Sequence, residues 1–180
     1  LIKNIKNNII IFDFGNNFFS SKILNLVNKI KIKKYINVQT NSLNLGYNLF
    51  TKFTNAEYLS LDDREWKLGL KKEVIEISEI KKIFGKNVKF SITKGKNGSL
   101  YVDKKNVFKS PVFTDKSIDT TGCGDAYYAI TSLFLLSKAS PEIIPFIGNA
   151  YASMHSQNIG NSKIVDKVSF FKYLTSILKI

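Results

Sequence analysis

The sequence predicts a three-layer α/β domain, in which helices cover both faces of a mostly parallel β-sheet. Two observations predict this class. Up to residue 85, short apolar segments of strand length alternate with segments of helical spacing, a pattern typical of parallel βαβ units. Between residues 88 and 108, short strand-like segments are instead separated by tight turns, which indicates an antiparallel meander at the sheet edge. The 180 residues are most simply one domain, spanning 1–180.

The first half of the chain supplies strands and helices in alternation. β-Branched and aromatic runs mark the strands, at 8–14, 35–38 and 56–61. Apolar residues spaced three or four apart mark the helices, at 18–30, 43–53, 62–70 and 77–84, with Gly85 as the stop of the last. Ligands of open α/β sheets bind beyond the carboxyl ends of the strands. Polar residues directly after a strand are therefore the first candidates for a site, at 13–17, 39–41, 62–65 and 93–98.

The second half begins with the meander and ends in helices. Its strands are predicted at 88–93, 99–102 and 107–108, with turns at 95–98 and 103–106. Residues 126–136 are apolar nearly all round, which predicts a helix buried in the core. The next helix runs to Gly160 and begins either at Ser140-Pro141, with serine as cap and proline in the first position, or at Pro145. A final amphipathic helix is predicted at 167–178.

Composition narrows the class of protein. No run of 18 apolar residues exists, so the sequence predicts no membrane span, and its start is too polar for a signal peptide. One cysteine permits no internal disulfide, which favours a cytoplasmic protein. The 27 lysines and arginines outnumber 14 acidic residues, for a net charge of +13, but the lysines are spread along the chain. A solvated basic surface is therefore favoured over a site for nucleic acid or another polyanion.

One stretch, from Ser117 to Ala129, concentrates the candidate chemistry. Gly122 and Gly124 allow the backbone to approach a ligand without an intervening side chain. The buried helix that follows would aim free N–H groups and the positive end of its dipole into this loop, which suits an anion. Asp125 would lie beside that anion hole as a carboxylate. Such a group can deprotonate a hydroxyl while phosphate charge develops next to it.

The residues Asp119-Thr-Thr-Gly-Cys-Gly-Asp125 resemble the signature Asp-Thr-x-Gly-Ala-Gly-Asp of the PfkB/ribokinase family of carbohydrate kinases, with Cys123 at the alanine position. The alternative is a glycine loop that only turns the chain into a buried helix. The resemblance implies a ribokinase-like sandwich and ATP-dependent phosphoryl transfer to a hydroxyl of a sugar or sugar phosphate. Asp125 would be the catalytic base, and the backbone of Gly122, Cys123 and Gly124 would form the anion hole.

Thr93-Lys-Gly95-Lys-Asn-Gly98 resembles a second segment of the family, Thr-x-Gly-x-x-Gly, which approaches the nucleotide phosphates. Thr93, Gly95 and Gly98 would supply a hydroxyl and backbone N–H groups for ATP. The alternative is a hairpin turn at Asn97-Gly98, because this dipeptide is preferred between two strands. Both roles can hold at once, with Gly98 serving the turn.

Asp62-Asp-Arg-Glu65 resembles the family's Asn-x-x-Glu motif, which is tied to phosphate and magnesium handling, with Asp62 in place of asparagine. Mg²⁺ takes oxygen ligands, so this carboxylate pair is chemically suited, and Glu65 is the candidate metal ligand. The same spacing also predicts a capping box, in which Asp62 caps a helix and Glu65 reaches back to it.

The resemblance also implies a monovalent cation such as K⁺ beside the anion hole, with Asp119 and Thr121 at matching positions and Gly160 as a weaker candidate. Cys123 is interpreted as a small residue in place of alanine; the alternative is a reactive thiol at a helix start. His155, the only histidine, is interpreted as a packed or surface residue, because a metal site needs more than one such ligand.

Asp13-Phe-Gly15 after the first strand, and residues 39–62, most resemble the branch of heptose-phosphate kinases and bifunctional sugar kinase/nucleotidyltransferases. The similarity covers nearly all 180 residues but corresponds to the carboxyl-side portion of a kinase domain, without the amino-terminal part and the β lid. Because the chain begins at Leu1 rather than methionine, we expect a longer protein, with a homodimer or a fused nucleotidyltransferase domain as the open arrangements. Two other functions stay open: a non-catalytic nucleotide-binding or assembly domain, and a polyanion-binding module.

Overall fold

A computed structural model describes residues 7–40, 45–114, 116–160 and 162–179. The chain divides into two compact units. The first holds the described residues up to Ile92 together with Val102–Asn106, and the second holds Thr93–Tyr101 and the described residues from Val107 onward. Each unit is considered by itself below. Among the described residues, no helix combines the length and the apolar character that a membrane crossing requires.

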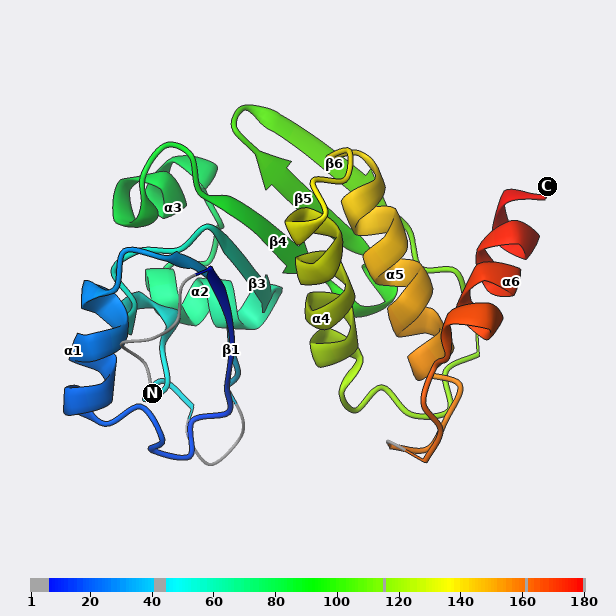
Figure 1. Cartoon of the computed structure of the whole chain (residues 1–180), viewed down its shortest axis with the longest axis horizontal. Coiled ribbons are helices and arrows are strands. Elements are labelled where there is room, and N and C mark those ends of the chain that lie inside the picture. The colour runs from blue at the N-terminus through cyan, green and yellow to red at the C-terminus, as the bar shows by residue number, and fades with distance from the viewer. Residues whose placement is uncertain (1–6, 41–44, 115, 161, 180) are drawn as a thin grey trace. The chain divides into compact units, whose positions relative to one another are not determined.

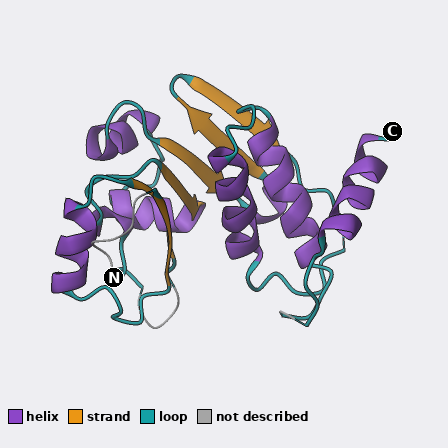
Figure 2. Ribbon diagram, viewed as in Figure 1, coloured by secondary structure: helices purple, strands orange, loops and turns teal. Residues whose placement is uncertain are grey.

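Within the described part of the chain, six strands form one sheet in the order β1-β2-β3-β4-β5-β6. Their bounds are Asn8–Asp13 (β1), Lys33–Val38 (β2), Tyr58–Asp62 (β3), Lys89–Thr93 (β4), Ser99–Asp103 (β5) and Asn106–Ser110 (β6). β1 pairs with β2 and β2 with β3 in parallel, in a register that sets Asp13 opposite Val38. Tight connections join β4, β5 and β6, so this end of the sheet is the predicted antiparallel meander (Figure 2).

The described residues of the first unit include three helices beside the parallel strands: α1 (Ser21–Lys29), α2 (Asp63–Leu70) and α3 (Ile77–Phe84) (Figure 1). The core of this unit combines aromatic and aliphatic side chains. The Trp66 side chain is fully buried between Phe50 and Phe90, with ring centroids 4.7 and 5.4 Å away. The Trp66 indole N–H donates to the Ser91 carbonyl at 3.0 Å. One side chain thus ties α2 to the sheet by both packing and a hydrogen bond.

The prediction of a helix at 43–53 is wrong for residues 45–53, the part of this range that the structure describes. Residues 41–44 lie outside the described residues, and the rest of the segment forms turns followed by a single 3₁₀ turn, Phe50–Lys52 (η2). The Asn48 amide donates instead to the Gln39 carbonyl at 2.9 Å, and Phe50 and Phe53 are buried in the core. These tertiary contacts outweigh a helical spacing of apolar residues, because intrinsic propensity is a weak determinant.

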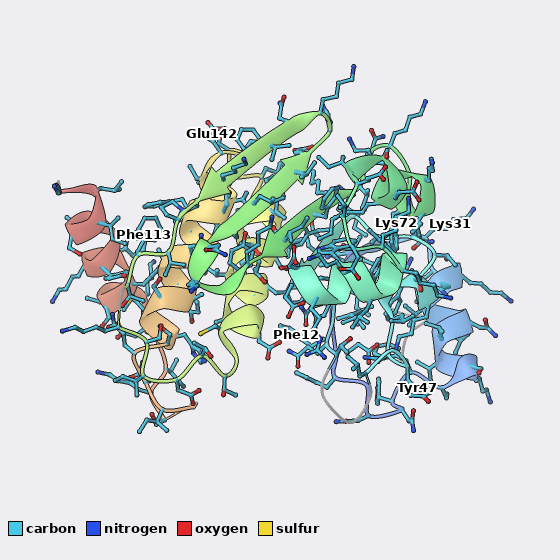
Figure 3. All side chains as sticks on the ribbon, turned by 180° about the vertical axis from the view of Figure 1, so that it is seen from behind. Phe12, Lys31, Tyr47, Lys72, Phe113 and Glu142 are labelled. Atoms are coloured by element: carbon cyan, nitrogen blue, oxygen red, sulfur yellow. The ribbon has the colours of Figure 1, made fainter. Side chains whose placement is uncertain are left out.

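The second unit is built on α4 (Cys123–Leu136), α5 (Ile143–His155) and α6 (Lys167–Leu178), with a 3₁₀ turn at Gly95–Asn97 (η3) between its strands. α4 and α5 lie side by side, and α6 packs on α5 (Figure 1). Phe170 of α6 meets Tyr151 of α5 edge-on at 5.2 Å. Phe113, labelled in Figure 3, meets Phe146 edge-on at 5.1 Å. α4 is not buried all round as predicted, since Leu133 is exposed.

Both predicted ends of the helix that corresponds to α5 are wrong. It begins at Ile143, so Pro145 is the third helical residue, where a missing N–H leaves no intrahelical bond unmade. It ends at His155 rather than Gly160, because the chain after Ser156 turns away. The Ser156 carbonyl accepts the N–H groups of Ile118 and Asp119, at 2.8 and 3.1 Å. That pairing brings the loop after α5 against the loop before α4.

Candidate active site

The candidate anion loop, residues 119–124, leads directly into α4. Gly122 is the residue before the helix and adopts a left-handed conformation, with φ 77° and ψ 0°. The Ala126 N–H donates to the Gly122 carbonyl at 2.9 Å, which starts the helical ladder. The Cys123 N–H donates to the Thr120 carbonyl at 3.2 Å. The N–H groups of an α-helix's first turn have no intrahelical acceptor and lie at the positive end of its dipole, so this end of α4 is suited to an anion.

The fold constrains the two glycines of the loop to different degrees. Gly122 has a positive φ, and a β-carbon there would lie 3.1 Å from the His155 ring. The chain itself therefore favours glycine at 122. At Gly124, by contrast, an added β-carbon would meet no atom of the described chain within 4 Å. The fold alone does not require glycine at 124, so a requirement there would come from a ligand.

Asp125 lies in the first turn of α4 and is partly buried. Two residues further on, the Tyr127 hydroxyl accepts a hydrogen bond from the Ser99 hydroxyl at 3.1 Å, and both residues are buried. Ser99 directly follows Gly98, so this bond connects the Thr93–Gly98 segment to the helix that carries Asp125. Within the second unit, the structure thus links the two predicted nucleotide-related segments.

Asp119 joins the anion loop to the loop after α5. One carboxylate oxygen accepts the Thr121 N–H and the other accepts the Gly160 N–H, each at 2.8 Å. The hydrogen bonds of the Thr121 backbone and side chain, followed by that of the Gly160 backbone, hold the pKa of Asp119 below its usual value. Asp119 is therefore a carboxylate that fixes the shape of the loop.

His155, the last residue of α5, contacts the same loop. Its Nε2 atom lies 3.1 Å from the Thr121 carbonyl oxygen. The prediction of a packed or surface residue was incomplete, because it did not include this hydrogen bond. No local pattern could have revealed it, since 34 residues separate the two partners.

Cys123 behaves as a small packed residue. Its Sγ lies 3.6 Å from the Ala152 carbonyl on α5. Burial, together with the negative charge of Asp119, raises the pKa of the Cys123 thiol above its usual value. A raised pKa leaves less of the reactive thiolate at neutral pH. These contacts support the alanine-like interpretation over that of a reactive thiol.

Asp62 and Glu65, in the first unit, form the predicted capping box at the start of α2. The Glu65 N–H donates to Asp62 Oδ1 at 2.7 Å, and the Asp62 N–H donates to Glu65 Oε2 at 2.9 Å. The other oxygen of Glu65 accepts the Thr40 N–H at 2.9 Å, just after β2. Glu65 therefore holds the ends of β2 and β3 together, and the capping alternative is confirmed.

A buried polar cluster beside the ends of β1 and β2 was missed by the sequence analysis. Asp13 is only 3% exposed and forms an ion pair with Lys52. The Asn48 amide donates to the carbonyls of Asp13 and Gln39, at 3.3 and 2.9 Å. Asp13 and Gln39 were marked as polar residues after strands, but Asn48 and Lys52 were assigned to a helix. Only the tertiary structure brings these residues together.

The Thr93–Gly98 segment forms the 3₁₀ turn η3, not a two-residue Asn-Gly turn. The Lys94 N–H donates to the Gly98 carbonyl at 2.8 Å, which closes the loop. Gly98 has φ 78°, and a β-carbon there would overlap the Ser110 carbonyl. Gly95 also has a positive φ, 52°, but faces open space. The fold thus explains glycine at 98 far more strongly than at 95.

Gly98→Ala is therefore expected to destabilise the protein by more than about 2 kcal/mol, because left-handed strain adds to a clash with backbone. Gly95→Ala is the matched control, with an expected loss of about 1 kcal/mol from strain alone. Urea unfolding followed by circular dichroism measures both. Equal losses in the two variants would contradict this assignment.

Comparison with known proteins identifies the family. A model of the pfkB family of carbohydrate kinases matches residues 19–167. The chain belongs to this family. No curated protein sequence matched the chain.

Solved structures of a phosphofructokinase and a ribokinase share the fold. The phosphofructokinase-2 of Escherichia coli, in complex with substrates and products, is 18% identical with a TM-score of 0.72, over 98% of this chain and 60% of that one. A potassium complex of the same enzyme is 20% identical with a TM-score of 0.65, over 88% and 52%. The ribokinase of Thermotoga maritima is 17% identical with a TM-score of 0.74, over 97% and 61%. This likeness confirms the three-layer α/β class, and the chain spans about 60% of the length of the first and third of these proteins.

The residues of this pfkB-family chain differ in how well they fit metal ions. Among the described residues, no group of three or more His, Cys, Asp or Glu side chains is placed to hold a metal. Asp62 and Glu65 supply the oxygen ligands that Mg²⁺ prefers, and a carboxylate can accept N–H groups while also binding water or metal. The Asp119 carboxylate and the Thr121 carbonyl already accept hydrogen bonds from within the chain, so both are held in place without a monovalent cation.

Proposed function

We propose that this chain carries the catalytic base and the anion hole of an ATP-dependent kinase that phosphorylates a hydroxyl of a sugar or sugar phosphate. The observation that carries the proposal is the start of α4. There a carboxylate, Asp125, occupies the first turn beside Gly124, whose surroundings are open, at the positive end of the helix dipole. Phosphoryl transfer requires little beyond positioning and electrostatic stabilisation, and this arrangement supplies both.

In this proposal, Asp125 accepts the proton of the attacking hydroxyl. The N–H groups of Gly122, Cys123 and Gly124 stabilise the transferred phosphoryl group. Because the Cys123 N–H donates to the Thr120 carbonyl at 3.2 Å, its bond to a phosphate would replace that long hydrogen bond. Preorganised backbone donors of this kind are a large source of rate enhancement.

We also propose which residues bind ATP and the metal ions. Thr93, Gly95 and Gly98 approach the phosphates of ATP. In the first unit, Asp62 and Glu65 would hold Mg²⁺, an ion that supplies charge neutralisation in phosphoryl transfer. A monovalent cation such as K⁺ has Asp119 and Thr121 as its candidate ligands. A potassium complex is known for the similar Escherichia coli phosphofructokinase-2.

We assign the protein to the heptose-phosphate kinase and bifunctional sugar kinase branch, on the basis of the segments around Asp13 and 39–62. With this assignment we propose a cytoplasmic protein that either forms a homodimer or carries a fused nucleotidyltransferase domain. A second candidate function is nucleotide binding without catalysis. If the protein bound ATP but transferred no phosphoryl group to any member of a sugar-phosphate panel, this second function would be favoured over the kinase.

Gly124→Ala tests the proposed anion hole. Alanine is favoured over glycine in a helix by about 1 kcal/mol, and the β-carbon meets no atom of the chain, so the stability of the variant is expected to be equal or higher. The same methyl group would occupy the space of a bound phosphate. We therefore expect the affinity for a non-hydrolysable ATP analogue, measured by calorimetry, to fall at least about tenfold, or 1.4 kcal/mol. Unchanged affinity in a folded variant would reject the anion hole.

A further inference from the structure

His155 holds one particular peptide group of the anion loop. Its Nε2 atom lies 3.1 Å from the carbonyl oxygen of Thr121, the residue before Gly122. A carbonyl oxygen can only accept a hydrogen bond, so Nε2 must carry the proton and donate it. On the other side of Thr121, the backbone N–H is held by Asp119 at 2.8 Å. Both backbone polar groups of Thr121 are therefore engaged.

The direction of the Gly122 N–H follows from this contact. A trans peptide is planar, and its C=O and N–H point in opposite directions. The described chain contains no cis peptide bond. Since the Thr121 carbonyl points at the imidazole, the N–H of Gly122 points to the opposite side of the loop, away from His155. The ring also lies against Gly122, because a β-carbon there would be 3.1 Å from Nε2.

Glycine makes this restraint necessary. A flip of the Thr121–Gly122 peptide would turn the N–H toward α5, and it changes mainly the ψ of Thr121 and the φ of Gly122. Most residues resist such a change, but glycine populates positive and negative φ about equally. The conformation that suits an anion is thus not secured by residue 122 itself, and a hydrogen bond to the preceding carbonyl is an effective restraint.

We propose that His155 is a positioning residue, whose Nε2–H fixes the Thr121–Gly122 peptide so that the Gly122 amide stays directed at the transferred phosphoryl group. This inference rests on the proposed function. His155 makes no contact with substrate in this role; it acts through Gly122. Because phosphate charge develops most in the transition state, loss of this amide would lower turnover more than ATP binding.

Two variants separate the hydrogen bond from simple packing. His155→Gln keeps an N–H donor that can reach the same carbonyl, whereas His155→Leu keeps comparable bulk without a donor. We expect turnover of ATP with a sugar-phosphate acceptor to fall about 10- to 100-fold in the leucine variant, with the KM for ATP changed less than about threefold. The glutamine variant is expected to stay within about fivefold of the unchanged protein, since a donor remains.

Nuclear magnetic resonance provides a readout independent of activity. Gly122 is the only glycine that follows a threonine, so ¹³C-carbonyl threonine combined with ¹⁵N-glycine selects its amide alone among ten glycines. The probe is the magnesium complex of a non-hydrolysable ATP analogue. In the unchanged protein we expect the Gly122 signal to shift on titration, in His155→Leu to shift far less, and in His155→Gln to respond again.

The possible outcomes separate the proposed anion hole from the proposed role of His155. A Gly122 signal that ignores the nucleotide in the unchanged protein, although the nucleotide binds, would overturn the proposed anion hole and this inference with it. A Gly122 signal that responds equally in the unchanged protein and in His155→Leu would overturn only the role of His155. Equal loss of turnover in the glutamine and leucine variants would also overturn it, because packing rather than donation would then be the cause.

Discussion

Asp125→Asn is expected to lower turnover about 100- to 10,000-fold, the usual contribution of a general base. Asparagine has nearly the same shape as aspartate but cannot accept a proton at neutral pH. The carboxylate lies in the first turn of α4, beside the open space at Gly124. Steady-state kinetics with ATP and a panel of sugars and sugar phosphates, on the longest natural chain that contains this sequence, measures the effect.

The affinity for ATP is expected to change less than about threefold, because a general base acts on the acceptor hydroxyl rather than on the nucleotide. Asp63→Asn is the matched control. Asp63 also lies in the first turn of a helix, α2, where it forms an exposed ion pair with Lys67 at 2.7 Å. Its replacement should leave turnover nearly unchanged. If Asp125→Asn retained full activity, the assignment of the base would be wrong.

Trp66→Ala is expected to lower the free energy of unfolding by about 3–5 kcal/mol, the range for removal of a large buried side chain. Trp66 is 0% exposed and contacts the rings of Phe50 and Phe90. Its indole N–H donates to the Ser91 carbonyl, which would lose this partner. Trp66→Phe keeps most of the packing, so its loss should be about 1–3 kcal/mol, the cost of the broken hydrogen bond. Urea unfolding monitored by circular dichroism measures each value.

Tyr47→Ala is the control for Trp66. The Tyr47 side chain is 91% exposed and is labelled in Figure 3. Its removal should change the free energy of unfolding by less than about 0.5 kcal/mol, as is usual at the surface. A Trp66→Ala variant as stable as Tyr47→Ala would show that the aromatic core of the first unit is not as described.

The elements that the sequence predicted well are those whose signals are local. The bounds of α6 at Lys167–Leu178 and of α3 at Ile77–Phe84 were predicted from apolar spacing and a glycine stop. The capping box of α2 followed from an acidic residue three positions before a glutamate. The helix predicted at 43–53 failed because Asn48 and Phe50 have partners on β1, just after β2 and on α2, and no local pattern contains these contacts.

In the candidate site, too, only the local features could be predicted from the sequence. Gly122, Gly124 and Asp125 form one contiguous motif, so the start of α4 could be predicted from order and spacing alone. The contacts of Asp119 with Gly160, and of Thr121 with His155, join residues 41 and 34 positions apart. The ion pair of Asp13 with Lys52 likewise depends on how β1 and the segment after β2 meet.

The sequence by itself determined the fold class, the family resemblance and the candidate base, because each depends on periodicity or on neighbouring residues. The tertiary structure decided which remote groups hold the glycine loop, namely His155 at the Thr121 carbonyl and Gly160 at the Asp119 carboxylate. It also showed that glycine at 98 serves the fold while glycine at 124 does not. These points depend on distances between atoms remote in sequence, and residue order carries no direct measure of such distances.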